Sequence, residues 1–174
     1  MGARCVVVGP PARQLLAGLG EREALTIFEA ERPNDLRPRS AIDAAQAFAE
    51  GAERTKAIRD SAWAAQRAAQ ETRDAGLDAA SEAARAALAA AGAAFLHPLA
   101  KATQVKHILG AAAHAARSFE LSAGDNPNVG VIHVQKVGLL PVRTVQDVLR
   151  RYPPAPPGGG RVGELIRRLD VLLR

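Results

Sequence analysis

The chain has 174 residues and a formal net charge of +5, and 48% of its residues are apolar although only 3% are aromatic. This length suits one domain that buries its core without disulfides or metal ions. Because aromatic residues are scarce, alanine, leucine and valine must form the interior, which requires helices that approach closely. Charged residues interrupt the Ala-rich segments, so no window reaches the roughly 18 apolar residues of a membrane span.

The N-terminal residues also exclude some classes of protein. Cys5 is the one cysteine of the chain, so it cannot form an internal disulfide, and no Cys/His cluster lies near it. The apolar run Val6–Val8 is interrupted at once by Gly9-Pro10-Pro11 and is too short for the core of a signal peptide. A lone cysteine fits a reducing compartment, and we therefore expect a cytoplasmic protein.

Apolar residues recur at spacings of three and four through the first 121 positions, which predicts five or six helices. Gly51 and Gly76 are expected to end two of them, and His97-Pro98 to break or kink another. After a short leucine stripe at 15–19, the helices are expected at about 21–31, from the cap at Asn34 or Asp35 to Gly51, and at about 53–74, 77–95 and 99–121.

The last third of the chain has a different pattern. Val129 to Val137 is rich in β-branched residues, so we expect a short strand there that pairs with Cys5–Val8. Helices are predicted from Val142 to Tyr152 and from Val162 to Leu173, with a Pro/Gly linker at 153–160 between them. The last helix is expected to dock through Leu165, Ile166, Leu169 and Leu172. The fold class is thus mainly all-α, a compact bundle of about six to eight helices with or without a two-stranded β element.

Charge is distributed unevenly along the chain. Residues 21–50 contain four arginines against seven carboxylates, whereas residues 101–174 contain eleven basic side chains against five acidic ones. The basic surplus keeps a helical nucleic-acid-binding protein as an alternative. The arginine and alanine excess could equally reflect genomic base composition.

Asp35, Arg37 and Arg39 crowd the start of a predicted helix. Two guanidinium groups beside free backbone amides could hold an anion or a carboxylate of a partner protein. Alternatively, Asp35 caps the helix while the arginines bridge to Glu29, Glu31 or Asp43. The residues alone leave both interpretations open.

The histidines are the other candidates. His107 and His114 are seven residues apart, which places them on nearly one helical face, and His97 closes the preceding helix. No HExxH, His-x3-His or CxxC pattern occurs, so we expect no metal site and no cofactor; the imidazoles more simply hydrogen-bond across closely packed helices. No nucleophile elbow or Walker loop is present either, but an enzyme or small-ligand binder that uses His97 and His107 remains an alternative. Trp63 and the four phenylalanines lie in or beside helical stripes and are expected in the core.

Two segments resemble a known family. Ile27-Phe28-Glu29 followed by Pro33–Ala45, with its Asp35-Leu36-Arg37-Pro38-Arg39 block, resembles the opening of the Imm-5-like family of putative immunity proteins. Ala89–Gly92 with His97, and then Val105–Ala112, resemble a second signature of that family. Some members are labelled exonuclease SbcC-like; an ATPase of that kind needs a Walker loop and a long heptad coiled coil, and this sequence has neither.

The resemblance covers about residues 24–121 and implies an all-helical protein without catalytic activity that neutralises a cognate toxin by direct binding. On this view Asp35, Arg37, Arg39, His97 and His107 form either a structural latch or part of the binding surface. Residues 1–174 are then a single helical domain with a family-like core at 24–121 and an extension at 122–174. The Pro/Gly linker would also permit exchange of the last helix in a homo-oligomer.

Overall fold

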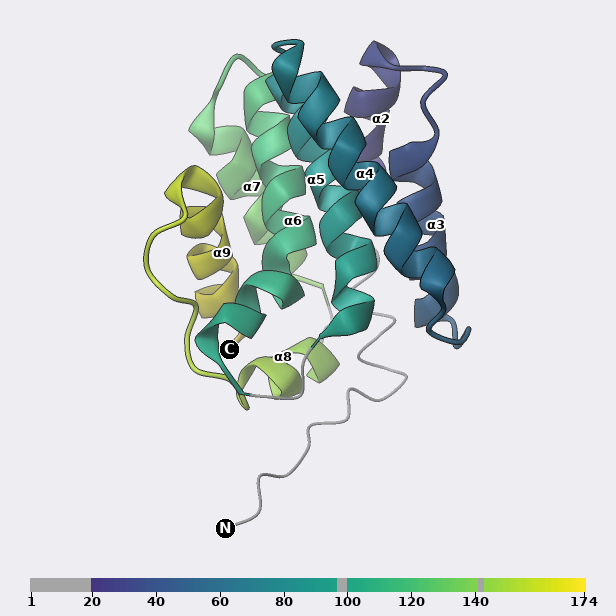
Figure 1. The fold of residues 1–174 in the computed structure, drawn as a ribbon. Helices are drawn as coiled ribbons and strands as arrows, with labels where there is room; N and C mark the ends of the chain where they lie inside the picture. The colour runs from purple at the N-terminus through teal and green to yellow at the C-terminus, as the bar shows by residue number, and fades with distance from the viewer. Residues whose placement is uncertain (1–19, 97–99, 141–142) are drawn as a thin grey trace.

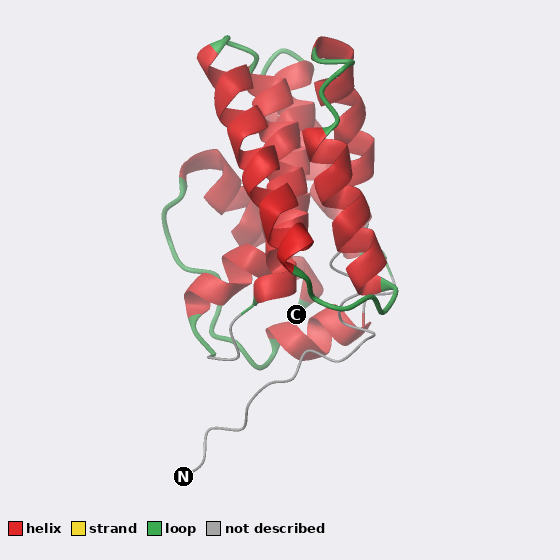
Figure 2. Ribbon diagram, turned by 45° about the vertical axis from the view of Figure 1, so that its right-hand side comes forward, coloured by secondary structure: helices red, strands yellow, loops and turns green. Residues whose placement is uncertain are grey.

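Helices form all the regular structure in the parts of the chain that the structure describes. The structure is a computed structural model that describes residues 20–96, 100–140 and 143–174. These residues form eight α-helices and one 3-10 turn: α2 (Glu21–Glu31), α3 (Arg37–Ala49), α4 (Lys56–Asp74), α5 (Asp78–Gly92), η1 (Ala93–Phe95), α6 (Ala102–Ser122), α7 (Pro127–Gly138), α8 (Arg143–Leu149) and α9 (Gly160–Leu173). The all-α prediction is confirmed, as Figure 2 shows.

The helices pack in two groups that meet along α5 and α6. In the first, α5 contacts α2, α3 and α4; in the second, α6 contacts α7 and α9. Each group has its own cluster of buried apolar side chains, and Figure 1 shows α8 across the lower end of the bundle. Since α5 and α6 also contact each other, they form the centre of the fold.

Very small side chains fill this centre. The buried residues of α5 are all alanine or serine: Ala80, Ser81, Ala83, Ala84, Ala86, Ala87, Ala90 and Ala91. The short Ser81 hydroxyl donates to the Ala69 carbonyl of α4 at 2.7 Å, and the Ser118 hydroxyl of α6 donates to the Ala79 carbonyl at 2.8 Å. Hydroxyls this short reach a neighbouring backbone only when the helices lie close together.

The segment Val129–Val137, predicted as a strand, is helical and belongs to α7. The helix begins where the Asn126 side chain accepts a hydrogen bond from the Asn128 amide, with Pro127 in its first turn. Burial of Val134 and Val137 against α6 and α9 outweighs the small helix penalty of β-branched residues. The strand prediction was therefore wrong here, and its proposed partner Cys5–Val8 lies outside the described residues, as does the leucine stripe at 15–19.

The last helix packs against its own chain. Leu165, Ile166 and Leu169 are buried as predicted, but Leu172 is exposed and Leu173 is buried in its place. These leucines share one cluster with Leu109 of α6.

Trp63 was expected in the core but is 60% exposed. The buried stripe of α4 includes Ile58, Ala62, Ala65 and Ala69, and Trp63 projects from the opposite side of the helix. An indole does not fit between helices separated by alanine side chains, so it lies on the outer surface. Phe28 and Phe48 are buried, and Phe95 and Phe119 pack partly buried against the core.

Close packing around α5 predicts that enlarging its alanines destabilises the protein. Ala86→Leu should lower the free energy of unfolding by about 1–3 kcal/mol, because the added methyl groups have no space. The matched control is Ala57→Leu at the exposed start of α4. This substitution should change the free energy of unfolding by less than about 0.5 kcal/mol. Urea unfolding measures both, and an Ala86→Leu variant as stable as the wild type would contradict the packing described.

Candidate functional site

The turn between α2 and α3 contains the conspicuous Asp-Leu-Arg-Pro-Arg block. Asp35 accepts a hydrogen bond from the backbone amide of Arg37 at 3.1 Å, and so satisfies one of the free amides at the start of α3. Pro38 follows in the first helical turn, where its missing N–H costs nothing. The block therefore stabilises the start of α3 and also places charged side chains on the surface there.

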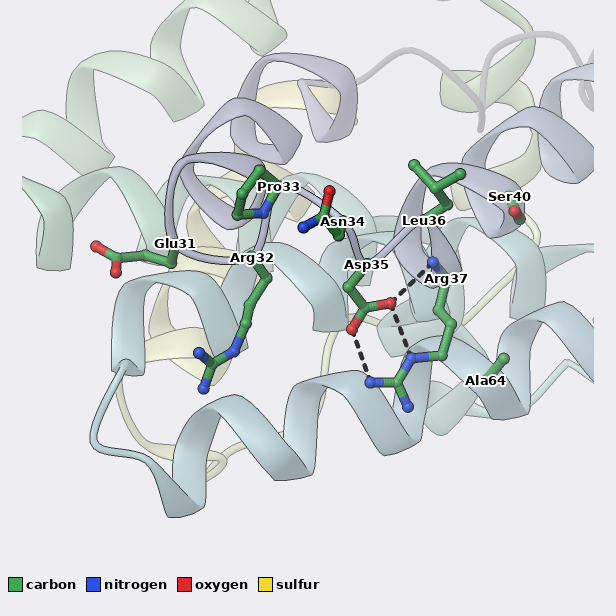
Figure 3. A pocket seen from close by; sticks show the side chains of 9 residues that line it. All are labelled: Glu31, Arg32, Pro33, Asn34, Asp35, Leu36, Arg37, Ser40 and Ala64. Carbon is green, nitrogen blue, oxygen red and sulfur yellow. Dashed lines mark hydrogen bonds and ion pairs between the residues drawn. The ribbon is translucent and has the colours of Figure 1, made fainter.

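The Arg37 guanidinium joins the turn to α4. Its Nε and Nη2 donate to the two Asp35 carboxylate oxygens at 2.9 and 2.7 Å, as Figure 3 shows. Nη1 donates to Glu71 Oε1 at 3.0 Å, and Nη2 also contacts the other Glu71 oxygen. One side chain thus connects the turn with a helix 34 residues further along the chain. We call Asp35, Arg37 and Glu71 the latch.

The latch changes the acidity of its carboxylates. The hydrogen bond from the Arg37 side chain lowers the pKa of Asp35, although burial of the carboxyl acts in the opposite direction. The same guanidinium lowers the pKa of the exposed Glu71. Both carboxylates in turn raise the pKa of Arg37, so the latch is charged at neutral pH.

Arg39 makes a second connection within the same region. Its Nε and Nη2 donate to the Glu29 carboxylate, both at 2.7 Å, and join α3 to α2. Arg22 and Asp43 form a parallel pair between the same helices at 3.0 Å. Much of the acidic surplus at 21–50 therefore lies in ion pairs.

An open groove of about 760 Å³ runs beside the latch. Its lining residues are Glu31, Arg32, Pro33, Asn34, Asp35, Leu36, Arg37, Ser40 and Ala64. In Figure 3 the Arg32 and Arg37 side chains extend to the same side of the turn. Leu36 is 58% exposed, so the groove carries an apolar side chain next to charged ones.

The histidine candidates do not join this groove. His97 lies outside the described residues, and His107 is exposed on α6, where it lines a separate cavity with His114. The His114 Nδ1 lies 2.6 Å from Glu82 Oε2 of α5, a hydrogen bond across helices of the kind expected. Within the described ranges, no three His, Cys, Asp or Glu side chains come together as they would around a metal ion.

Sequence reasoning missed a buried ion cluster at the end of α6. The Glu120 carboxylate is fully buried and accepts hydrogen bonds from Arg161 Nη2 at 2.6 Å and Arg117 Nη1 at 2.9 Å. Gly130 of α7 leaves the space, since a Cβ there would lie 2.1 Å from a Glu120 oxygen. A glycine in a valine-rich helix was the available signal, but the 41-residue separation of Glu120 and Arg161 hides the pairing.

Residues 19–137 match the family described as "Imm-5 like putative immunity protein". The chain belongs to this family. The matched region includes the latch, the Arg39–Glu29 pair, His107 and Glu120, whereas α8 and α9 with Arg161 follow it. Comparison with curated proteins and with solved structures found no match to the chain. Among the described helices, none combines the length and the hydropathy needed to cross a bilayer.

The lowered pKa of Asp35 predicts a pH-dependent contribution to stability. A folded pKa below the unfolded one means that the carboxylate stabilises the protein above about pH 4 and loses this effect as the pH falls through the folded pKa. Asp35→Asn should therefore cost about 1–2 kcal/mol at pH 7 and less near pH 3. Urea unfolding at the two pH values measures the difference.

Glu31→Gln is the matched control, because Glu31 is an exposed carboxylate at the end of α2 beside the same turn. It should alter stability little at either pH. An Asp35→Asn variant that is equally destabilised at both pH values would contradict a charge-dependent latch.

The buried Glu120 predicts a large effect of its arginine partner. Arg161→Met should lower the free energy of unfolding by about 3–5 kcal/mol, because it removes a hydrogen-bonded countercharge from a buried carboxylate. Arg168→Met on the same helix removes only an exposed pair with Glu164 and should cost less than about 1 kcal/mol. Thermal and urea unfolding compare the two, and equal effects would rule out the special role of Arg161.

Proposed function

We propose that this protein acts in the cytoplasm by binding a cognate toxin directly and neutralising it, without catalysing a reaction. The observation that supports this most is the family match over residues 19–137. Immunity of this kind requires an exposed, preformed surface that complements another protein.

The groove and the outer face of α4 supply the best candidate surface. Leu36 and Trp63 are both more than half exposed, and Trp63 directly precedes Ala64, which lines the groove. Arg67 lies one helical turn after Trp63 on the exposed side of α4. Tryptophan and arginine are enriched among the residues that dominate the energy of protein interfaces.

In this proposal the latch is a positioning device for the surface. Arg37 ties the α2–α3 turn to Glu71 of α4, so the two elements are held together before a partner arrives. Preorganisation reduces the entropy lost on binding and so favours affinity. Arg39, which is bonded to Glu29, supports α3 in the same way.

The acidic side chains at 21–50 are a second feature that a basic toxin could recognise. Of the seven carboxylates at 21–50, Glu29, Asp35 and Asp43 are bonded to arginines and Glu21 is buried. Glu23, Glu31 and Glu50 are exposed and bond no arginine of the described residues. A broad acidic face toward a basic toxin is therefore a weaker basis for recognition than the Leu36 and Trp63 side chains.

The test is titration calorimetry of the purified protein with the toxin-like product of a neighbouring gene. We expect a one-to-one complex whose dissociation constant rises about tenfold or more in Trp63→Ala, as for an interface hot spot. Leu139→Ala is the matched control, because Leu139 is 85% exposed at the end of α7, away from the groove. Failure to form a complex, or equal affinities of wild type and Trp63→Ala, would contradict the proposal.

A DNA-binding measurement distinguishes the proposed toxin-binding protein from a nucleic-acid-binding one. Binding to a DNA duplex that weakens steeply with salt would favour a basic nucleic-acid-associated protein instead. We expect no such binding at physiological ionic strength.

A further inference from the structure

A second cavity, of about 670 Å³, lies between α5, α6 and the start of α9. Its volume is in the range of small-molecule sites, roughly 300–1,000 Å³. Apolar side chains form part of its wall, namely Leu88, Ala89, Phe95, Val162 and Ile166. None of its lining residues is shared with the groove at the α2–α3 turn.

Among the described residues, the ionisable side chains that line this cavity are basic or imidazole groups: Arg85, Lys106, His107 and His114. The nearby carboxylate is Glu82, which contacts His114 Nδ1 with one oxygen and lies 3.7 Å from Arg85 Nε with the other. That longer distance is too great for a hydrogen bond. The single Glu82 carboxylate therefore lies beside both His114 and Arg85. Lys106 adds a positive charge that Glu82 does not neutralise.

Arg85, which lines this cavity, has an unmatched donor. Its Nε is buried and has no hydrogen-bond partner among the described residues. Leaving such a donor without an acceptor is unfavourable, and the cost is larger for a charged group. Because Arg85 lines the cavity, its positive charge favours an anion there over a cation or a neutral apolar molecule.

The backbone at the start of α9 also favours an anion in the cavity. Gly158, Gly159 and Gly160 all adopt left-handed conformations, with φ of +83°, +78° and +58°. Gly159 and Gly163 line the cavity, which brings the first turn of a 14-residue helix to its edge. The positive end of the α9 helix dipole favours negative charge nearby.

We propose that this cavity binds a small organic anion, a molecule that carries a phosphate or carboxylate group on an apolar body. The anionic group lies near Arg85 and Lys106, and the apolar body contacts the wall around Leu88 and Phe95. This site goes beyond toxin binding and uses a different part of the molecule. It also gives His107 a place in a ligand site without assigning it a reaction.

The test is a titration of the full chain with phenyl phosphate, followed by the backbone amide shifts of an ¹⁵N-labelled sample. Inorganic phosphate and phenol serve as parallel probes that separate charge from apolar contact. We expect saturable shifts at the cavity with phenyl phosphate, weaker binding of phosphate and none of phenol. Absence of saturable shifts with phenyl phosphate, or equal binding of phenol, would overturn the proposal.

Two variants locate the binding. Lys106→Gln should raise the dissociation constant about tenfold, since it removes one charge-assisted contact. Lys101→Gln is the matched control, because Lys101 is exposed just before α6 and does not line the cavity. An equal loss in both variants would indicate diffuse attraction to a basic protein and would overturn the site.

Gly92→Leu blocks the cavity without changing its charge. Gly92 lines the cavity in an ordinary helical conformation, with φ of −63°, and a Cβ added there would meet no atom within 4 Å. The variant should fold with an unchanged melting temperature and lose binding of phenyl phosphate. Wild-type binding in Gly92→Leu would overturn the proposed location, and Trp63→Ala should bind phenyl phosphate as the wild type does.

Discussion

Close contact between α5, whose buried residues are all alanine or serine, and the helices around it determines the rest of this structure. On α5 every buried side chain is one of these two types, and Ser81 and Ser118 bond directly to carbonyls of neighbouring helices. Small side chains remove little apolar surface each, so stability depends on many short contacts along long helices. Trp63 lies on the outer surface of α4, whereas Phe28 and Phe48 are buried in the cluster that includes the α5 alanines.

The same constraint moves charged groups to the ends and edges of the helices. Arg37 joins a turn to the last part of α4, and Arg39 joins α3 to α2. Glu120 differs from these groups, because it is fully buried and bonded to Arg161 of α9. This bond connects the region shared with the family to the helix that follows it. In this chain α9 follows the family region and packs on α6 and α7.

Local signals in the sequence were enough for most of the helices and for part of the site. The α2 bounds follow from apolar spacing, and the capping role of Asp35 follows from its place before Pro38. Local propensity misassigned Val129–Val137, because tertiary burial decides the structure of β-branched residues there. The pairs Arg37–Glu71 and Glu120–Arg161 could not be found from one sequence, since the residues of each pair lie more than 30 positions apart.

In the proposed function, a partner protein covers the groove at the α2–α3 turn and the outer face of α4. Hydroxyl-radical footprinting of the complex with the cognate toxin tests it most directly, because the chain has a single tryptophan and radicals label exposed indoles strongly. We predict that Trp63 and Leu36 lose labelling in the complex, whereas Leu139 and Val171, exposed on α7 and α9, keep it. Protection of Leu139 and Val171 with Trp63 unchanged would contradict this assignment of the surface.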